Sequence, residues 1–281
     1  MSETKLPSWP PYLVAFLSFV GINVIAAIVV GGYLFVTAGD PSLPMDARVE
    51  QLAKLSSTPQ ALVLSVVLTS TLFIVIGAWA SARGGRRSGE AVVRRMRLYP
   101  VDARDAFAAS VGVLGTSMVL DVFVEAVGLG GRGSLGSIHD ALNLLPGHLL
   151  FAAALVVGVF PGIGEEVFFR GFLMRRIEAA DGWRTAWVAS SILFGIFHFD
   201  PIHSPTAGLI GLYLGWMVLR SGSLWVGVVA HTVNNFVATV TVGRPIADAL
   251  APLVAVIGLA AAGSAIWYVK ERRPTVVAGD W

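Results

Sequence analysis

Two carboxylates and an arginine interrupt an apolar stretch of the sequence, GIGEEVFFRGFL, which contains Glu165, Glu166 and Arg170. On a helix, Glu166 and Arg170 share one face in the favourable acid-before-base order for an ion pair. Glu165 points about 100° away from them and has no arginine at that spacing. We therefore expect Arg170 to neutralise Glu166 and Glu165 to remain free as a general base. The alternative is a solvated helix end beside Arg175 and Arg176.

Two further apolar segments carry polar groups at helical spacing. Phe194 and His198 are four residues apart in FGIFHFD, and His231 and Asn235 are four apart in HTVNNF. The second pair presents an imidazole and an amide on one face, although such residues can also simply bond a neighbouring helix. His203, in the loop that follows His198, is a weaker candidate. A carboxylate, two imidazoles and an amide together suit water activation and oxyanion stabilisation.

The same residue types leave a metal alternative open. Glu165, His198 and His231 could serve as three zinc ligands with an open fourth position. The chain has no cysteine, and none of its five histidines is followed by glutamate, so thiolate chemistry and the HExxH zinc motif are absent. No GxSG or GxGD motif occurs either. The residues alone therefore leave open whether a metal takes part.

The composition predicts an integral membrane protein. Hydrophobic residues make up 55% of the 281 and charged residues 14%, against roughly 25% charged in soluble domains. The mean hydropathy is +0.73. We expect an all-α transmembrane bundle, a single membrane domain over residues 1–281 with its chemical motifs in 161–236, and a first span that is retained rather than cleaved. The expected membrane helices, about eight, are Tyr12–Val36, Pro59–Ala82, Asp105–Val127, Leu144–Phe169, Trp183–Phe199, Thr206–Leu219, Leu224–Val242 and Ile246–Val269.

The distribution of basic residues predicts the orientation. Most arginines and lysines follow the second, fourth, sixth and eighth expected spans: Arg83, Arg86, Arg87, Arg94, Arg95, Arg97, Arg175, Arg176, Arg184, Arg220, Lys270, Arg272 and Arg273. The opposite side carries Arg48, Lys54, Arg132 and Arg244. By the positive-inside rule, we expect a multi-pass protein of the cell membrane with both termini cytoplasmic. The same rule explains the high pI, so we expect the lipid bilayer as a partner and no nucleic acid.

Other features of the sequence give weaker expectations. Pro161, Gly162 and Gly164 precede the two glutamates and should kink or widen that helix. The stretches AGDPSLPMDARVEQLAK and GLGGRGSLGS are expected to be plain connectors. Asp121 and Glu125 are one helical turn apart in the third span, and we expect a structural or interfacial role for them.

Three motifs in order make the chain similar to a known family. These are EExxxR (Glu165, Glu166, Arg170), FxxxH (Phe194, His198) and HxxxN (His231, Asn235), within Pro161 to Phe236. They resemble the CPBP or Abi family of CAAX proteases and bacteriocin-processing enzymes, which includes the Ras-converting CAAX endopeptidases.

The resemblance implies an intramembrane endopeptidase with an eight-helix core. Glu165 and His198 would activate the water, His231 and Asn235 would stabilise the oxyanion, Glu166 and Arg170 would set the geometry, and Phe194 would pack beside the site. The resemblance favours the glutamate type of catalysis, without a metal or other cofactor, although the family has also been labelled metalloprotease and zinc remains the alternative. The substrate would be a membrane-associated peptide or protein, prenylated or not. The alternative functions are a non-proteolytic scaffold or immunity protein and a proton-coupled transporter.

Overall fold

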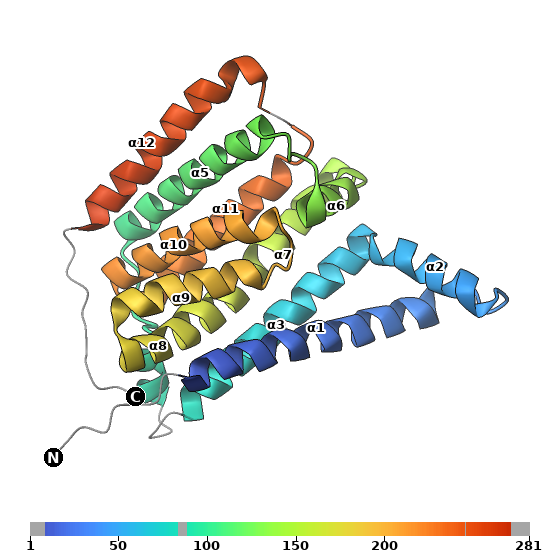
Figure 1. Cartoon of the computed structure of the whole chain (residues 1–281), viewed down its shortest axis with the longest axis horizontal. Coiled ribbons are helices and arrows are strands. Elements are labelled where there is room, and N and C mark those ends of the chain that lie inside the picture. Colours follow the sequence, from blue (N-terminus) through green and yellow to red (C-terminus); the bar gives the residue numbers. More distant parts are fainter. Residues whose placement is uncertain (1–8, 84–88, 245, 271–281) are drawn as a thin grey trace.

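The protein is an all-α bundle, which confirms the predicted fold class. The computed structural model describes residues 9–83, 89–244 and 246–270, and every regular element in these ranges is a helix (Figure 1). The elements are α1 (Trp9–Thr37), α2 (Met45–Ser56), α3 (Pro59–Arg83), α4 (Gly89–Arg95), α5 (Ala103–Ala126), α6 (Gly133–Asn143), α7 (Gly147–Glu166), the π-helix η1 (Val167–Leu173), α8 (Met174–Asp181), α9 (Trp183–Ile196), α10 (His203–Ser221), α11 (Leu224–Val240), the 3₁₀ turn η2 (Asp248–Leu250) and α12 (Ala251–Lys270).

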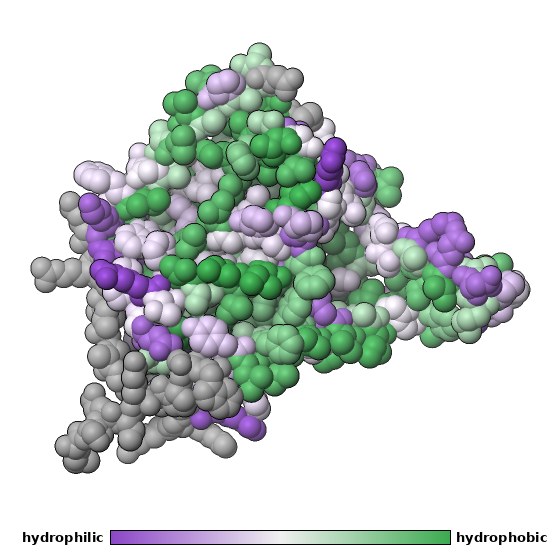
Figure 2. Space-filling view, in the orientation of Figure 1, coloured by the Kyte–Doolittle hydropathy of each residue, from purple (hydrophilic) through white to green (hydrophobic). Residues whose placement is uncertain are grey.

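Five helices are long and apolar enough to cross a membrane. They are α1, α3, α5, the continuous helix that α7, η1 and α8 form together, and α12. The other three expected segments also form helices, α9, α10 and α11, but each falls below the limit of length or of hydropathy. Figure 2 shows apolar residues over most of the bundle, with hydrophilic ones gathered toward its ends. The chain is therefore a multi-pass helical protein, and the number of eight spans stays a prediction.

Helix α7 lies at the centre of the packing. It contacts α3 on one side and α11 on the other, and α5 in turn packs against both α11 and α12. Helices α9 and α10 pack against each other, and α10 also contacts α11 and α5 (Figure 1). Four segments carry the chemical residues or lie against them, and these segments are thus neighbours in the bundle. They are α7 with η1, α9, α10 and α11.

The helix that carries the two glutamates differs from the sequence expectation in two respects. It does not end at Phe169 but continues to Asp181, and it widens after the glutamates, in the π-helix η1, rather than at Pro161. Six successive residues, Phe168 to Leu173, are buried in this turn. The phenylalanine rings explain the position of η1, because Phe168 and Phe169 both pack against Phe73 of α3. A π-turn lets consecutive side chains face the core where a regular helix would turn some of them outward.

Both expected connectors contain a helix, so these two predictions are wrong. In the first, α2 packs Leu52 and Leu55 against Val30 and Leu34 of α1. In the second, α6 starts at Gly133 and buries Leu142. The high content of proline and glycine made the short apolar repeats in these segments difficult to recognise from the sequence. The repeats form helices because they pack against apolar surfaces of α1 and α7.

Leaving aside the basic residues around α2 and α6, most of the described basic residues lie at one end of the bundle. We call it the basic end; Arg83, Arg175, Arg176, Arg220 and Lys270 lie at or near the helix ends there. Helix α1 begins and α12 ends at this side, whereas α2 and α6 lie at the opposite end (Figure 1). Arg86, Arg87, Arg272 and Arg273, which also entered the orientation prediction, lie outside the described residues.

Two glycines bring α7 close to its neighbours. A Cβ atom on Gly164 would lie 2.6 Å from the carbonyl oxygen and 2.8 Å from the Cα of Ser70 in α3. A Cβ atom on Gly162 would lie 3.0 Å from the backbone nitrogen of Thr232 in α11. Backbone atoms cannot rotate away as a side chain can. The glycines before the glutamates therefore set the spacing of α3, α7 and α11.

This spacing predicts the effect of a single methyl group. We expect Gly164→Ala to lower the free energy of unfolding by about 1–3 kcal/mol, the usual cost of overpacking a tight interior. Gly263→Ala in α12, where a Cβ would meet nothing within 4 Å, is the matched control and should not destabilise the protein. Thermal unfolding of both purified variants in detergent measures the difference; equal melting temperatures would contradict the close approach of α3 and α7.

Candidate active site

The predicted ion pair between Glu166 and Arg170 is present and lies in the core. Arg170 Nη1 donates to Glu166 Oε1 over 2.8 Å, and both side chains are 0% exposed. This burial is incompatible with the alternative of a solvated helix end. Arg170 Nη2 also donates to the carbonyl oxygen of Gly211 in α10 over 3.1 Å, and the guanidinium lies over the Phe194 ring, 4.3 Å from its centroid. The arginine thus ties η1 to α9 and α10.

Two glycines make room for this pair. A Cβ atom on Gly227 of α11 would lie 2.7 Å from Glu166 Oε2. A Cβ atom on Gly211 would lie 3.3 Å from Arg170 Nη2 and 3.0 Å from the Phe194 ring. Both charged groups therefore sit against bare backbone, where a larger residue would displace them. Sequence reasoning missed both glycines, because nothing local distinguishes them from the other glycines of the chain.

His231 joins the same network through Glu166. Its Nδ1 lies 3.0 Å from Glu166 Oε1, which also accepts from Arg170. An ionised carboxylate can only accept a hydrogen bond, so Nδ1 carries the proton. The imidazole is 5% exposed and meets the edge of the Phe194 ring, with centroids 5.8 Å apart. Glu166 therefore fixes both the tautomer and the orientation of His231, and leaves Nε2 for chemistry.

Glu165 is the less constrained of the two glutamates. Its side chain is 19% exposed, and its Oε2 lies 3.9 Å from His231 Nε2, too far for a direct hydrogen bond. In the neutral imidazole Nε2 is an acceptor, as is the carboxylate. A water molecule can donate to both acceptors and so bridge them. The pairing expected from the sequence, one glutamate neutralised and one free, is thus what the structure shows.

His198 lies in the turn after α9, in a second group of polar residues. Its Nδ1 lies 2.9 Å from the Phe194 carbonyl oxygen, which can only accept, so Nδ1 is again the protonated nitrogen. Its ring packs against Phe194 and against His203, whose centroid is 4.3 Å away. In the described residues no hydrogen bond or ion pair joins His198 to Glu165. The Phe194 ring contacts both His198 and His231 and so connects the two groups.

Asp200 holds the loop after His198 in place. Its carboxylate accepts from the backbone N–H groups of Ile202, His203 and Ser134, the last of which belongs to α6. These bonds, that of His203 first, hold the pKa of Asp200 below its usual value. The loop therefore starts α10 and fastens it to α6. His203, a weak candidate from the sequence, contacts His198 and Ser134 Oγ, at 3.4 Å from its Nδ1, and so supports the loop.

Asn235 is oriented by a chain of side chains that sequence reasoning did not find. Ser117 Oγ of α5 donates to Asn234 Oδ1 over 2.6 Å, and Asn234 Nδ2 donates to Asn235 Oδ1 over 3.4 Å. The amide nitrogen of Asn235 makes no hydrogen bond to the described residues and remains available as a donor. Helical spacing marks Asn235 beside His231, but the partner of Asn234 lies 117 residues away and gives no local signal.

The remaining candidates do not join this site. Asp121 and Glu125 are exposed on α5, and the Glu125 carboxylate lies against the backbone of Gly130. In the described part of the chain, no three histidine, aspartate or glutamate side chains gather into a group that could hold a metal ion. The geometry therefore gives no support to the zinc alternative with Glu165, His198 and His231 as ligands, nor to the metalloprotease label.

Comparisons with known proteins agree with the motifs. Residues 147–237 match the model of the Rce1-like, type II CAAX prenyl endopeptidase family. In Bacillus subtilis (strain 168), the protein named "Uncharacterized protein YyaK" is 29% identical over 153 residues, covering 44% of this chain and 50% of its own length. The one named "Putative membrane peptidase YdiL" is 25% identical over 114 residues, or 41% and 45% of the two chains. The chain thus spans about half the length of the curated relatives it matches. No solved structure gives a significant match.

The two adjacent glutamates should differ sharply in their effect on stability. Glu166→Gln removes the charge that compensates buried Arg170, and we expect it to cost about 3–5 kcal/mol of unfolding free energy. Glu165→Gln is the matched control: it is the same substitution one residue earlier, with no hydrogen bond to lose, and should change stability by less than about 1 kcal/mol. Equilibrium unfolding of both variants in detergent micelles measures the difference. Equal losses would mean that Glu166 is not the structural partner of Arg170.

Proposed function

We propose that this chain, whose residues 147–237 are Rce1-like, is an intramembrane endopeptidase in which Glu165 activates water to cleave a peptide bond of a membrane-associated substrate. The observation that carries the proposal is the division between the two glutamates. Glu166 binds Arg170 and His231, whereas Glu165 accepts no hydrogen bond from the described residues and faces His231 Nε2 across 3.9 Å.

The proposed step begins with a water between Glu165 Oε2 and His231 Nε2. Because both atoms are acceptors, the water donates a hydrogen bond to each and keeps a lone pair for attack on the peptide carbonyl carbon. Glu165 takes one proton as the C–O bond forms, which is general base catalysis. When the tetrahedral intermediate collapses, the C–N bond breaks and the leaving amine receives that proton. The products are a new carboxyl terminus and a new amino terminus.

The oxyanion of this intermediate needs a donor, and Asn235 supplies one. Asn234 holds the oxygen of the Asn235 amide, so its nitrogen faces away and can donate. Sequence resemblance gives His231 to the oxyanion and His198 to the water. The distances favour His231 as the partner of Glu165, since its Nε2 lies 3.9 Å from Glu165 Oε2. Its Nδ1 is already bound to Glu166. His198, connected through Phe194, remains the second imidazole of the proposed site.

The membrane setting explains why charges are built into the bundle. Charged groups inside a membrane protein are costly and normally serve a function. Here they supply a base and bring water to a substrate that lies in the bilayer. We propose that the protein is located in the cell membrane with the basic end and both termini in the cytoplasm, in accordance with the positive-inside rule. The substrate is then a peptide or protein tail at that membrane, with or without a prenyl group.

Cleavage of quenched fluorescent peptides, prenylated and unprenylated, tests the proposal. We expect Glu165→Gln to lower kcat by about 10²–10⁴-fold, the usual contribution of a general base, and Asn235→Ala by about 10²–10³-fold through the loss of an oxyanion donor. Glu125→Gln, which removes an exposed carboxylate of α5, should keep the wild-type rate.

A chelator distinguishes the two catalytic types. Cleavage by a glutamate enzyme should persist after chelation. Stoichiometric zinc in the active protein, lost together with activity and restored with it, would replace our proposal by a metal mechanism. Undiminished cleavage by folded Glu165→Gln would contradict the role of Glu165.

A further inference from the structure

A groove separate from the candidate active site runs between α5, α9, α10 and α12. It has a volume of about 470 Å³, which lies in the usual range of ligand sites. Its walls include Leu209, Leu259 and Ile266, which are 40–61% exposed on the outer surface of the bundle. Along α10 it extends from Leu209 to Trp216, about 10 Å at the rise of an α-helix. A groove of this kind on a membrane helix bundle faces lipid.

The groove itself contains no side chain that is charged at neutral pH. Two of its polar groups are already engaged: Tyr213 donates its hydroxyl to the Ala109 carbonyl oxygen over 3.1 Å, and Trp187 Nε1 donates to the Leu212 carbonyl oxygen over 2.7 Å. Trp216 Nε1, at the end of the groove near Arg220, is buried and has no partner among the described residues. Away from Trp216, an occupant of the groove therefore has to be apolar, because a buried polar group would find no partner.

At the basic end, by contrast, two arginines and three tryptophans adjoin the groove. The Arg220 guanidinium lies 5.4 Å from the Trp216 ring centroid, and the Arg184 guanidinium lies 5.2 Å from that of Trp183. Trp216 packs against both Trp183 and Trp187, with centroids 6.5 and 5.5 Å apart. Tryptophans gather at the level of lipid headgroups in membrane proteins.

Among the described residues, neither of these arginines has a carboxylate partner. In the described residues Arg184 and Arg220 form no ion pair, and the one hydrogen bond of Arg220 runs from Nε to the Val269 carbonyl oxygen at 3.5 Å. The Nη groups of Arg220 are therefore free to bind an anion. A guanidinium binds a phosphate through two parallel hydrogen bonds, a geometry that a point charge does not offer.

From this arrangement we propose that the groove is a binding site for an anionic glycerophospholipid of the leaflet at the basic end. One acyl chain lies in the groove along α10, and the phosphate is bound by Arg220 and Arg184 beside the tryptophans. The complementarity of a charge-free groove with unpaired cations at one end carries the proposal. It is independent of the proposed proteolysis.

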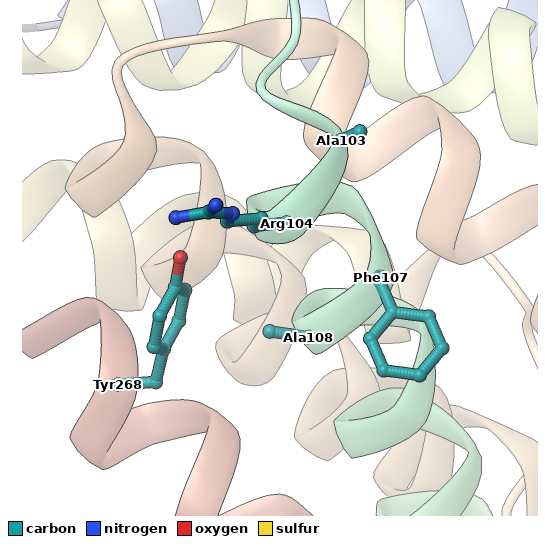
Figure 3. Close-up of a pocket in the computed structure, with 5 residues that line it drawn as sticks. All are labelled: Ala103, Arg104, Phe107, Ala108 and Tyr268. Carbon is teal, nitrogen blue, oxygen red and sulfur yellow. The ribbon is translucent and has the colours of Figure 1, made fainter.

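The basic end also offers a natural control. Arg104 lines a shallow pocket with Phe107 and Tyr268, at the start of α5. Figure 3 shows the Arg104 guanidinium near the Tyr268 hydroxyl, with the exposed Phe107 ring beside the pocket. Arg104 has the same charge as Arg220 and lies at the same end of the bundle, but the long apolar groove does not reach it. General attraction to anionic lipid would involve Arg104 as much as Arg220.

Native mass spectrometry of the full-length protein in detergent tests the proposal, with phosphatidylglycerol and phosphatidylcholine of identical acyl chains as probes. We expect wild type to prefer phosphatidylglycerol, and Arg220→Gln to weaken that binding about fivefold and phosphatidylcholine binding less, because the choline cation offsets the charge of the same phosphate. Arg184→Gln, at an exposed position, should act in the same direction. Arg104→Gln should have no effect. Excess inorganic phosphate should not displace the lipid, because it lacks the chain.

A second pair of variants tests the groove. Leu209→Trp places bulk into it from an exposed position and should weaken binding of both lipids, whereas Leu149→Trp, at a similarly exposed position of α7, should not. Thermal unfolding confirms that each variant is folded. Equal affinity of wild type for the two lipids, an equal loss in Arg104→Gln, or a groove that takes an isoprenoid peptide in place of phosphatidylglycerol would overturn the proposal.

Discussion

The structure depends on one constraint: an ion pair that is fully removed from solvent needs partners in the helices around it. Glu166 and Arg170 are each 0% exposed, and a buried charge without a partner costs several kcal/mol. The surrounding helices supply the Gly211 carbonyl oxygen, the face of the Phe194 ring and the Nδ1 proton of His231. Glu166 Oε2 and Arg170 Nε have no hydrogen-bond partner among the described residues. Helices α9, α10 and α11 are therefore held around η1 by the same pair, and their relative positions determine the geometry of the site.

This constraint also explains why two adjacent glutamates have different environments. Consecutive residues of a helix point about 100° apart, so only one of them can face Arg170. Glu166 does so and becomes part of the framework, while Glu165 points toward His231 Nε2 without a hydrogen bond. The network thus passes from a structural charge, through an oriented imidazole, to a free carboxylate. In our proposal His231 contributes both to the stability of the bundle and to the activation of water.

The sequence predicted the parts of this arrangement that depend on local spacing. The i, i+4 relation of Glu166 and Arg170 predicted their ion pair, which is confirmed, and the apolar runs predicted the helices. The extension of the central helix to Asp181 and its π-turn were not predicted, because they follow from the packing of phenylalanine rings against α3. Helices α2 and α6 were missed because their glycines and prolines outweighed short apolar repeats.

Contacts between distant segments were beyond the reach of sequence spacing. His231 and Glu166 are 65 residues apart, and Ser117 and Asn234 are 117 apart. Glu165, His198, His231 and Asn235 could be named as candidates, but which of them face each other depends on how α7, α9 and α11 pack. Their catalytic roles stay predictions.

The tautomer of His231 tests the central claim most directly. We would record ¹⁵N NMR spectra of histidine-labelled protein in detergent and assign His231 by comparison with His231→Ala. The account predicts a proton on Nδ1 and none on Nε2 in the neutral state, with this preference lost in Glu166→Gln. A neutral His231 that carries its proton on Nε2 would contradict the account, because Nε2 would then donate to Glu165 and leave no pair of acceptors to bind the water.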